Sequence, residues 1–474
     1  MTIERLRASL ADRSGLPIAA LVLLALPIAA RAQTAPPTAA RVRAVVDSLA
    51  RAFIADSGAP GVSIQVVRGR DTIVSGGWGF ANLDERVPAS AATLYRIGSI
   101  TKQFTSAAVM RLVQAGKVAL DDSIAAYVPN LPAAWRGVTV RELLNHTSGI
   151  PSYTDVGERW QRRWREDMPP DTLVAMTASD SMWFAPGTQW RYDNSGYVIL
   201  GMLLDHVTGT PYPEYIENDL LRPLGLDHTY YCDVHRILPG RAAGYERDGD
   251  HWTHSAFLSM TQPYSAGALC STVGDLARWN VWLATGHVVD SASYAAMTTP
   301  IGAAASHHYG FGLMADTLNG HQIIEHGGGI MGFITANAYL PTDRLSVTVL
   351  ANSGSAPSNQ LGMQVVRAAL GIPLVQPPKR VALSADQRGP YVGAYAMTMP
   401  NGSTLPFTVS DDGHALEAQA QGQDAFELIP YGHDVFGAAF DPSLRITFTV
   451  EHGQATGFSL LQGGVTLPAR RVNP

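Results

Sequence analysis

Ser99 and Lys102 are a candidate nucleophile and a candidate base. They stand three positions apart in the segment Gly98-Ser99-Ile100-Thr101-Lys102, where an apolar helix begins, so both side chains are expected on one face of that helix. A serine hydroxyl is a weak nucleophile without a base beside it, and a lysine whose pKa is lowered by burial can be that base. The helix N-terminus would favour negative charge developing at Ser99. The alternative is a serine near a helix start with a solvated lysine.

Tyr192 and Asn194 form a second group with chemical potential. They are separated by one residue in a loop that leads into the apolar helix expected over 197–207. A phenol and an amide in this arrangement can both face one cleft. In the alternative interpretation, Tyr192 packs on the loop and Asn194 only caps the helix.

The third group is the run His326-Gly327-Gly328-Gly329, which the pattern places at the end of a strand. Three successive glycines let the backbone approach a ligand closely and direct an N–H group at it. A plain turn is the alternative.

Together, in this order and spacing, the three groups resemble the motifs of the serine β-lactamase and penicillin-binding protein superfamily. Within it they are similar to the class C-like branch of D-alanyl-D-alanine carboxypeptidases, D-aminopeptidases and esterases. Residues 143–151 look like that branch's H-T-S-G turn, and 267–272 provide a further match, so the resemblance covers 40–372. The chain has no G-x-S-x-G sequence, which argues against the α/β-hydrolase route to the same chemistry.

The resemblance implies a role for each residue of the three groups. Ser99 would attack a carbonyl carbon, while Lys102 and Tyr192 share the removal of its proton and its transfer to the leaving group. Asn194 would hold the substrate's amide or acyl group. The substrate-binding set is completed by His326 and Gly328, and the backbone N–H groups of Ser99 and Gly329 would hold the oxyanion.

Two positions depart from the family's usual pattern. The third motif commonly has Lys followed by Thr, and His326 and Gly327 stand there instead. A neutral imidazole attracts a carboxylate far less than a lysine, which favours uncharged esters or amides as substrates. If His326 faces the substrate, its ordinary pKa predicts that it changes charge between about pH 5.5 and 7.5; the alternative is a structural histidine. Asp193 stands where the second motif usually has Ser.

The sequence therefore predicts an exported serine hydrolase that forms an acyl-enzyme on an ester or amide, of the esterase or D-amino-acid peptidase type. One alternative is a β-lactamase or D-alanyl-D-alanine carboxypeptidase. An alternative from another class is a binding or sensor module that kept the fold and lost turnover. The presence of Ser99, Lys102, Tyr192 and Asn194 argues against the latter.

Helices and strands that support these groups are expected at both ends of region 40–372, which the resemblance covers. A helix is expected over 40–57 and strands over 62–67 and 72–78; later strands follow at 321–325, 333–339 and 345–351, with a closing helix over 360–370. The two ends should share one antiparallel sheet, and the helical middle would be an insertion. The expected fold is α/β, an antiparallel sheet flanked by helices with a helical insertion, as in the β-lactamase and transpeptidase folds.

A separate unit is expected after the hydrolase domain of 40–372. Residues 373–384 have the composition of a linker, and 385–474 alternate short strands with turns, which predicts a small all-β barrel. The segment Tyr391-Val392-Gly393-Ala394-Tyr395 is similar to the lipocalin-like barrel that some members of the branch carry.

Residues 1–32 have the layout of a secretory signal peptide, with early arginines, an apolar stretch and an A-x-A cleavage site. We therefore expect a periplasmic or extracellular protein with no membrane span after cleavage, and an uncleaved anchor is the alternative. Export makes Cys232 and Cys270 candidates for a disulfide, although two buried thiols remain possible. The net charge of −6 gives no reason to expect nucleic acid, and neither a metal site nor a cofactor is indicated. A small molecule or peptide is the expected substrate; the oligomeric state is open.

Overall fold

The structure is a computed structural model that describes residues 36–56, 58–249, 251–375, 380–399, 402–421, 425–432, 434–438, 444–462 and 465–472. The expected signal peptide at 1–32 and part of the linker lie outside these ranges. Seven antiparallel strands form the main sheet, in the order β3-β2-β1-β12-β11-β10-β9. Their bounds are β1 Gly61–Arg68, β2 Asp71–Asn82, β3 Val87–Pro88, β9 Met314–Leu318, β10 His321–Ile330, β11 Phe333–Leu340 and β12 Leu345–Ala351.

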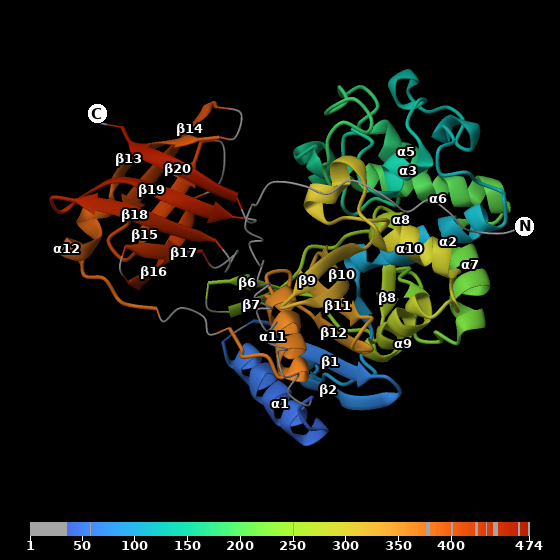
Figure 1. Cartoon of the computed structure of the whole chain (residues 1–474), viewed down its shortest axis with the longest axis horizontal. Coiled ribbons are helices and arrows are strands. Elements are labelled where there is room, and N and C mark those ends of the chain that lie inside the picture. Colours follow the sequence, from blue (N-terminus) through green and yellow to red (C-terminus); the bar gives the residue numbers. More distant parts are fainter. Residues whose placement is uncertain are drawn as a thin grey trace, which may run out of the picture. The chain divides into compact units, whose positions relative to one another are not determined.

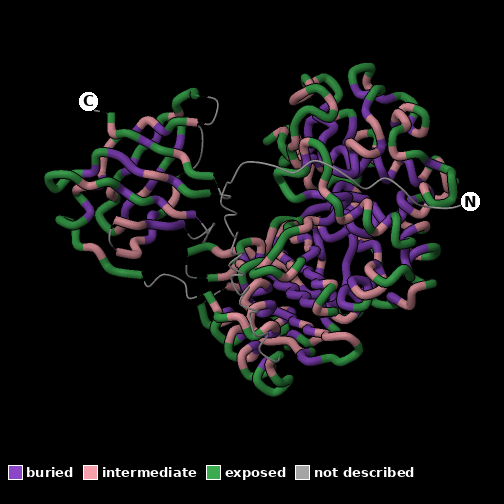
Figure 2. Tube along the Cα trace, viewed as in Figure 1, coloured by how far each residue is buried: buried purple, intermediate pink, exposed green. Residues whose placement is uncertain are grey.

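The centre of this sheet joins the two ends of the hydrolase region, as predicted. Strand β1 pairs antiparallel with β12, with Val62 opposite Ala351 and Arg68 opposite Leu345. Every residue of β12 is buried, which requires cover on both faces (Figure 2). One face is covered by helices α1 (Ala39–Ala55) and α11 (Ser358–Leu370), which lie side by side (Figure 1).

The opposite face of the sheet is covered by α9 (Val273–Ala284), beyond which lies the helical insertion. Helices α2 (Thr101–Gln114) and α6 (Asn194–Thr208) pack together in its core. The shorter helices of this region are α3 Val140–Leu144, α4 Glu158–Gln161, α5 Pro170–Ala175, α7 Tyr212–Tyr215, α8 Tyr264–Gly267 and α10 Ser291–Thr298. The prediction of an α/β fold with a helical insertion is confirmed.

A small sheet in the order β4-β8-β5 supports the segment before Ser99. Its strands are β4 Tyr95–Arg96, β5 Tyr230–Tyr231 and β8 Leu269–Ser271, and a separate hairpin consists of β6 Tyr245–Asp248 and β7 His251–His254. Cys232 and Cys270 form a disulfide with a Cα–Cα distance of 5.2 Å, inside the usual range for such bonds. The disulfide joins β8 to the segment that follows β5.

The C-terminal part is a closed eight-stranded barrel, which confirms the predicted all-β unit. Its strands are β13 Gly393–Thr398, β14 Thr404–Asp411, β15 Leu416–Ala420, β16 Phe426–Gly432, β17 Val435–Gly437, β18 Arg445–Glu451, β19 Gln454–Gln462 and β20 Val465–Arg471. Closure comes from the pairing of β13 with β20. The barrel has its own apolar core, in which Tyr395, Phe407, Phe448 and Phe458 pack together.

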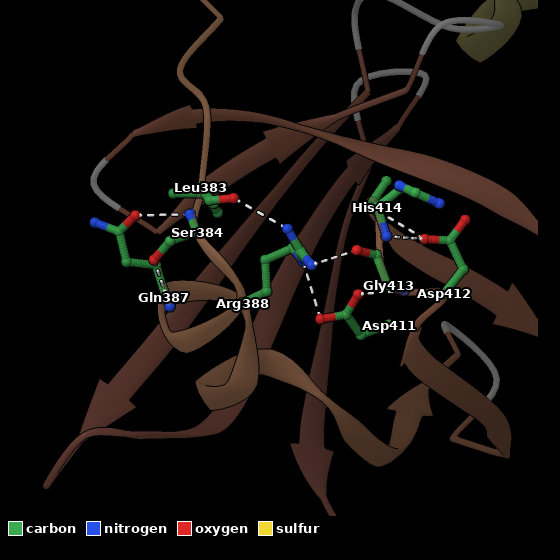
Figure 3. Close-up of polar contacts among 9 residues, drawn as sticks. Leu383, Ser384, Gln387, Arg388, Asp411, Asp412, Gly413 and His414 are labelled. Carbon is green, nitrogen blue, oxygen red and sulfur yellow. Dashed lines mark hydrogen bonds and ion pairs between the residues drawn. The ribbon is translucent and has the colours of Figure 1, made fainter.

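Arg388 fastens the entry to this barrel. It ends helix α12 (Ala385–Arg388), and its guanidinium donates to Asp411 at 2.9 Å and to the carbonyl oxygens of Leu383 and Gly413, both at 3.1 Å (Figure 3). Leu383 lies before α12, Asp411 is the last residue of β14, and Gly413 lies in the turn that follows β14. Because Arg388 is 8% exposed, these contacts supply acceptors for a guanidinium that burial would otherwise penalise.

Candidate active site

Ser99 lies where the short strand β4 gives way to a helix. It occupies a single 3-10 turn, Gly98–Ile100, and α2 begins two residues later at Thr101. Gly98 before it has φ +51°, a conformation that side chains rarely adopt. Gly98 and Ile100, on either side of Ser99 in this turn, are buried, whereas Ser99 itself stays partly exposed. This combination presents a serine hydroxyl to solvent on a rigid support.

Lys102 lies one turn further on, and its amine is fully buried. Nζ is 3.2 Å from Oγ of Ser99, 2.8 Å from Oδ1 of Asn194 and 2.9 Å from the carbonyl oxygen of Ala266. Burial lowers the pKa of Lys102 to about 7, and the negative charge of Asp193 opposes part of that fall. A neutral amine has two N–H donors and one lone pair. With the donors directed at Asn194 and Ala266, the lone pair is left for the hydroxyl proton of Ser99.

Tyr192 covers this amine with its ring, whose centroid is 4.7 Å from Nζ of Lys102. Burial raises the pKa of Tyr192 far above its ordinary value, and interaction with the Ser99 hydroxyl opposes part of the rise. The phenol therefore keeps its proton at neutral pH. Its buried Oη finds no hydrogen bond of ordinary geometry among the described residues. An unsatisfied hydroxyl next to a nucleophile is suited to donate to a substrate atom.

Asn194 is the first residue of α6, which therefore begins three residues earlier than expected. Its amide oxygen accepts from Lys102, and its amide nitrogen donates to Oγ1 of Thr154 at 3.1 Å. Both ends of the amide are thus bound to protein groups. In this arrangement, Asn194 orients Lys102.

Asp193 caps helix α6, which explains the early start. Its Oδ2 accepts from the N–H of Gly196 at 3.0 Å and from Oγ of Ser148 at 3.2 Å. The carboxyl is buried, and burial raises its pKa to about 7 although these bonds and Lys102 lower it in part. An Asp directly before an apolar helix is a recognisable N-cap signal, so the sequence could have predicted this cap.

His326 differs from our expectation. It is buried, with Nε2 2.9 Å from Oη of Tyr309 and Nδ1 2.5 Å from the carbonyl oxygen of Gly327. Burial, and next the positive charge of Lys102, lower the pKa of His326 to about 4. The prediction that this imidazole changes charge between pH 5.5 and 7.5 is therefore wrong, because the sequence pattern did not reveal its burial.

The third motif forms the C-terminal part of strand β10, which continues to Ile330 and does not end at Glu325 as expected. A Cβ added to Gly328 would lie 1.9 Å from the carbonyl oxygen of Ile97, so this glycine lets β10 pack against the segment before Ser99. Gly329 lies beside Gly98. The structure thus brings the backbones of the first and third motifs together, as an oxyanion site between Ser99 and Gly329 requires.

His146 and Tyr309 lie in this site, although the sequence analysis gave neither a role. The ring centroid of His146 is 4.2 Å from that of Tyr192, and its Nε2 is 3.1 Å from Oη of Tyr309. His146 belongs to the H-T-S-G segment already noted, so its position was foreseeable. Tyr309 follows two histidines in a loop with no recognisable motif, and no local signal marks it.

Within the described residues, no group of three or more His, Cys, Asp or Glu side chains could hold a metal ion. His254 lies near Asp84, and His308 near Asp316, in pairs on the surface. A search of the same residues finds no helix long and apolar enough to cross a membrane.

Comparison with known proteins identifies similar chains. The family model described as Beta-lactamase matches residues 46–370. A D-aminopeptidase of Gluconobacter oxydans (strain 621H) is 27% identical over 70% of this chain and 62% of its own length. The chain therefore spans less than two thirds of this curated relative.

Two solved structures extend the comparison. The octameric penicillin-binding protein homologue from Pyrococcus abyssi has a TM-score of 0.65 and 26% identity, covering 90% of this chain and 99% of its own. A D-stereospecific amidohydrolase from Streptomyces sp. has a TM-score of 0.61 and 30% identity, covering 70% of this chain and 98% of its own.

Proposed function

Because this chain belongs to the Beta-lactamase family, we propose that it is an exported serine hydrolase in which Ser99 forms an acyl-enzyme with an uncharged ester or amide. The observation that carries the proposal is the environment of Lys102: a buried amine with its donors directed at Asn194 and Ala266 and its lone pair free for Ser99. Such an amine is a base at neutral pH.

Acylation follows from the protonation states of the three groups. Neutral Lys102 takes the hydroxyl proton as Oγ of Ser99 bonds to the carbonyl carbon. Tyr192, which retains its proton, donates it to the leaving oxygen or nitrogen as the bond to the carbonyl carbon breaks. The proton on Lys102 then restores the phenol, so the net change is transfer of one proton from Ser99 to the leaving group.

Deacylation reverses the roles with water as the nucleophile. Lys102 takes a proton from water as the water oxygen attacks the acyl carbon. Oγ of Ser99 then leaves the acyl carbon and takes that proton from Lys102. The N–H groups of Ser99 and Gly329 are proposed to hold the oxyanion in both steps. Each donor of this kind contributes roughly 100- to 1000-fold in rate.

The proposed substrate class rests on His326. A neutral, hydrogen-bonded imidazole at the position usually held by lysine provides no charge for a carboxylate. The D-aminopeptidase and the D-stereospecific amidohydrolase among its relatives favour D-amino-acid amides or esters among the substrates that lack a carboxylate. Export is supported by the pattern at 1–32 and by the Cys232–Cys270 disulfide, since such bonds persist in oxidising compartments.

A β-lactamase or D-alanyl-D-alanine carboxypeptidase is the second candidate, favoured by the similarity to a penicillin-binding protein homologue. Both activities use substrates that carry a carboxylate. A silent binding module is a third candidate, but burying Lys102 beside Ser99 costs stability and would serve no purpose in a module without turnover.

Labelling and substrate tests decide among these candidates. A fluorophosphonate probe should label the wild-type protein at one site, and Ser99→Ala should lose the label and all hydrolysis. Ser410→Ala, at an exposed serine of β14, is the control and should keep both. Neutral p-nitrophenyl esters and D-amino-acid anilides should be hydrolysed with higher kcat/KM than nitrocefin. Full labelling of Ser99→Ala would refute the nucleophile, and a preference for nitrocefin would establish the second candidate.

A further inference from the structure

A chain of hydrogen bonds through Tyr309 lies beneath the active site and takes no part in the proposed reaction. Nδ1 of His146 accepts from the backbone N–H of Asp193 at 3.1 Å. Nε2 of His146 is 3.1 Å from Oη of Tyr309, which in turn is 2.9 Å from Nε2 of His326. Finally, Nδ1 of His326 is 2.5 Å from the carbonyl oxygen of Gly327.

For a neutral His326, the direction of every bond in this chain follows from its two ends. A backbone N–H can only donate, so Nδ1 of His146 carries a lone pair and Nε2 carries the proton. Oη of Tyr309 accepts a hydrogen bond from this Nε2–H group of His146, and its own single hydrogen is donated to Nε2 of His326. A carbonyl oxygen can only accept, so Nδ1 of His326 must donate to Gly327. With His326 neutral, one arrangement satisfies all four contacts, and burial favours this neutral form by lowering the pKa of His326 to about 4.

We propose that Tyr309 is a specificity-determining positioning residue, whose hydroxyl holds His326 as the neutral Nδ1–H tautomer so that the third motif offers no N–H to a substrate anion. The expected consequence is that carboxylate-bearing substrates are rejected, and this consequence rests on the proposed function. The tautomer itself rests on the hydrogen-bond chain and on the burial of His326.

The groups around His326 also favour its neutral form. Burial lowers the pKa of His326, and the positive charge of Lys102 in α2 lowers it further. The rings of Tyr309 and Tyr192 face it, with centroids 5.7 and 6.3 Å away. Glu325 precedes it on β10 and points to the opposite face of the sheet. Among the described residues no carboxylate acts on His326 to favour its charged form.

The first test measures the tautomer by ¹⁵N NMR of histidine-labelled full-length protein, with the His326 signal assigned by its loss in His326→Gln. In the wild type, Nδ1 should show the shift of a protonated nitrogen and Nε2 that of an unprotonated one, unchanged from pH 8 to 5.5. Tyr309→Phe keeps the ring and removes the hydroxyl, so His326 should lose this single tautomer and titrate at higher pH, because the bond to its neutral form is gone. A wild-type Nε2–H tautomer, or identical spectra of both proteins, would overturn the proposal.

The second test measures the kcat/KM for an anionic ester relative to that for its neutral analogue. This ratio should be flat within twofold from pH 5.5 to 8 in the wild type and rise roughly fivefold at the acidic end in Tyr309→Phe, since an imidazolium then faces the carboxylate. Tyr231→Phe removes a buried hydroxyl bonded to the carbonyl of Met260, and should leave the ratio flat. A flat ratio in Tyr309→Phe, despite the NMR change, would refute the specificity role. Undiminished hydrolysis by Ser99→Ala would instead refute the proposed function and leave the tautomer standing.

Discussion

Gly98 packs against Gly329 so closely that a Cβ on Gly98 would lie 2.9 Å from the nitrogen and 2.9 Å from the carbonyl oxygen of Gly329. Real Cβ atoms do not approach backbone atoms at this distance without displacement. The contact joins the segment before Ser99 to strand β10 and so sets the spacing of the two N–H groups proposed to bind the oxyanion. Gly98 cannot be replaced without moving one of these donors, whereas a Cβ on Gly329 would meet only the end of the Ile334 side chain, at 3.3 Å.

Gly98→Ala should therefore lower kcat at least 100-fold, because loss of one oxyanion donor has an effect of this size. Gly116 at the end of α2 is a matched control: its φ of +66° carries a similar conformational penalty, but open space surrounds it. Gly116→Ala should be destabilised by roughly 1 kcal/mol and keep its kcat. Steady-state kinetics and thermal melting of both variants measure this, and equal kcat values would contradict the argument.

Lys102 predicts the pH dependence of the reaction. The amine must be neutral to accept the Ser99 proton, and its pKa is lowered to about 7. For a neutral substrate, kcat/KM should thus rise as the pH increases through about 7 and level off above it. Lys102→Arg should reduce kcat by roughly 1000-fold at every pH, since a guanidinium cannot lose its proton in this range. A rate that falls from pH 6 to 8 would exclude Lys102 as the base.

Asp193→Asn should move that rise to lower pH. The charge of Asp193 raises the pKa of Lys102, so removing the charge leaves the amine neutral under more acidic conditions. The amide oxygen of Asn can still accept from Gly196 and keep the helix cap. Asp205→Asn removes a partly buried carboxyl near the other end of α6 and is the control. A kcat/KM profile that stays at its wild-type pH, or moves upward, would contradict the coupling.

The order and spacing of the sequence motifs predicted the juxtaposition of Ser99, Lys102 and Tyr192, because side chains three apart on a helix share a face and the resemblance located the third partner. Strand patterns at the two ends of the domain predicted that these ends share one sheet, and the pairing of β1 with β12 is how they do so. The strands and the Ser99–Lys102 pair depend on local periodicity, which a single sequence contains, whereas Tyr192 was located by the resemblance.

The environment of His326 could not be predicted in the same way. Its burial and its bond to Tyr309 depend on a loop 17 residues earlier in the chain folding over strand β10, and no periodicity encodes that contact. The extent of β10 was also underestimated, since glycines are usually read as strand breakers. Here Gly328 is required within the strand by the close approach of Ile97.

We expect the barrel to fold separately from the hydrolase domain. Its eight strands close on themselves, and its core cluster contains only residues from 391 to 469. The Streptomyces amidohydrolase matches over 98% of its own length while covering 70% of this chain. A protein with this fold therefore exists that has no counterpart of the rest of this chain.

A chain ending at Leu374 should thus be soluble and should still be labelled at Ser99 by a fluorophosphonate, while a fragment from Arg380 to the C-terminus should show a cooperative melting transition of its own. Each part keeps its own sheet and core, and small domains with a closed core unfold cooperatively. Far-UV circular dichroism of the two fragments and of the full-length protein measures this: the melts of the fragments should add up to that of the whole. If both fragments are insoluble, or if the fluorophosphonate no longer labels Ser99 in the shortened chain, the barrel and the hydrolase domain fold as one unit.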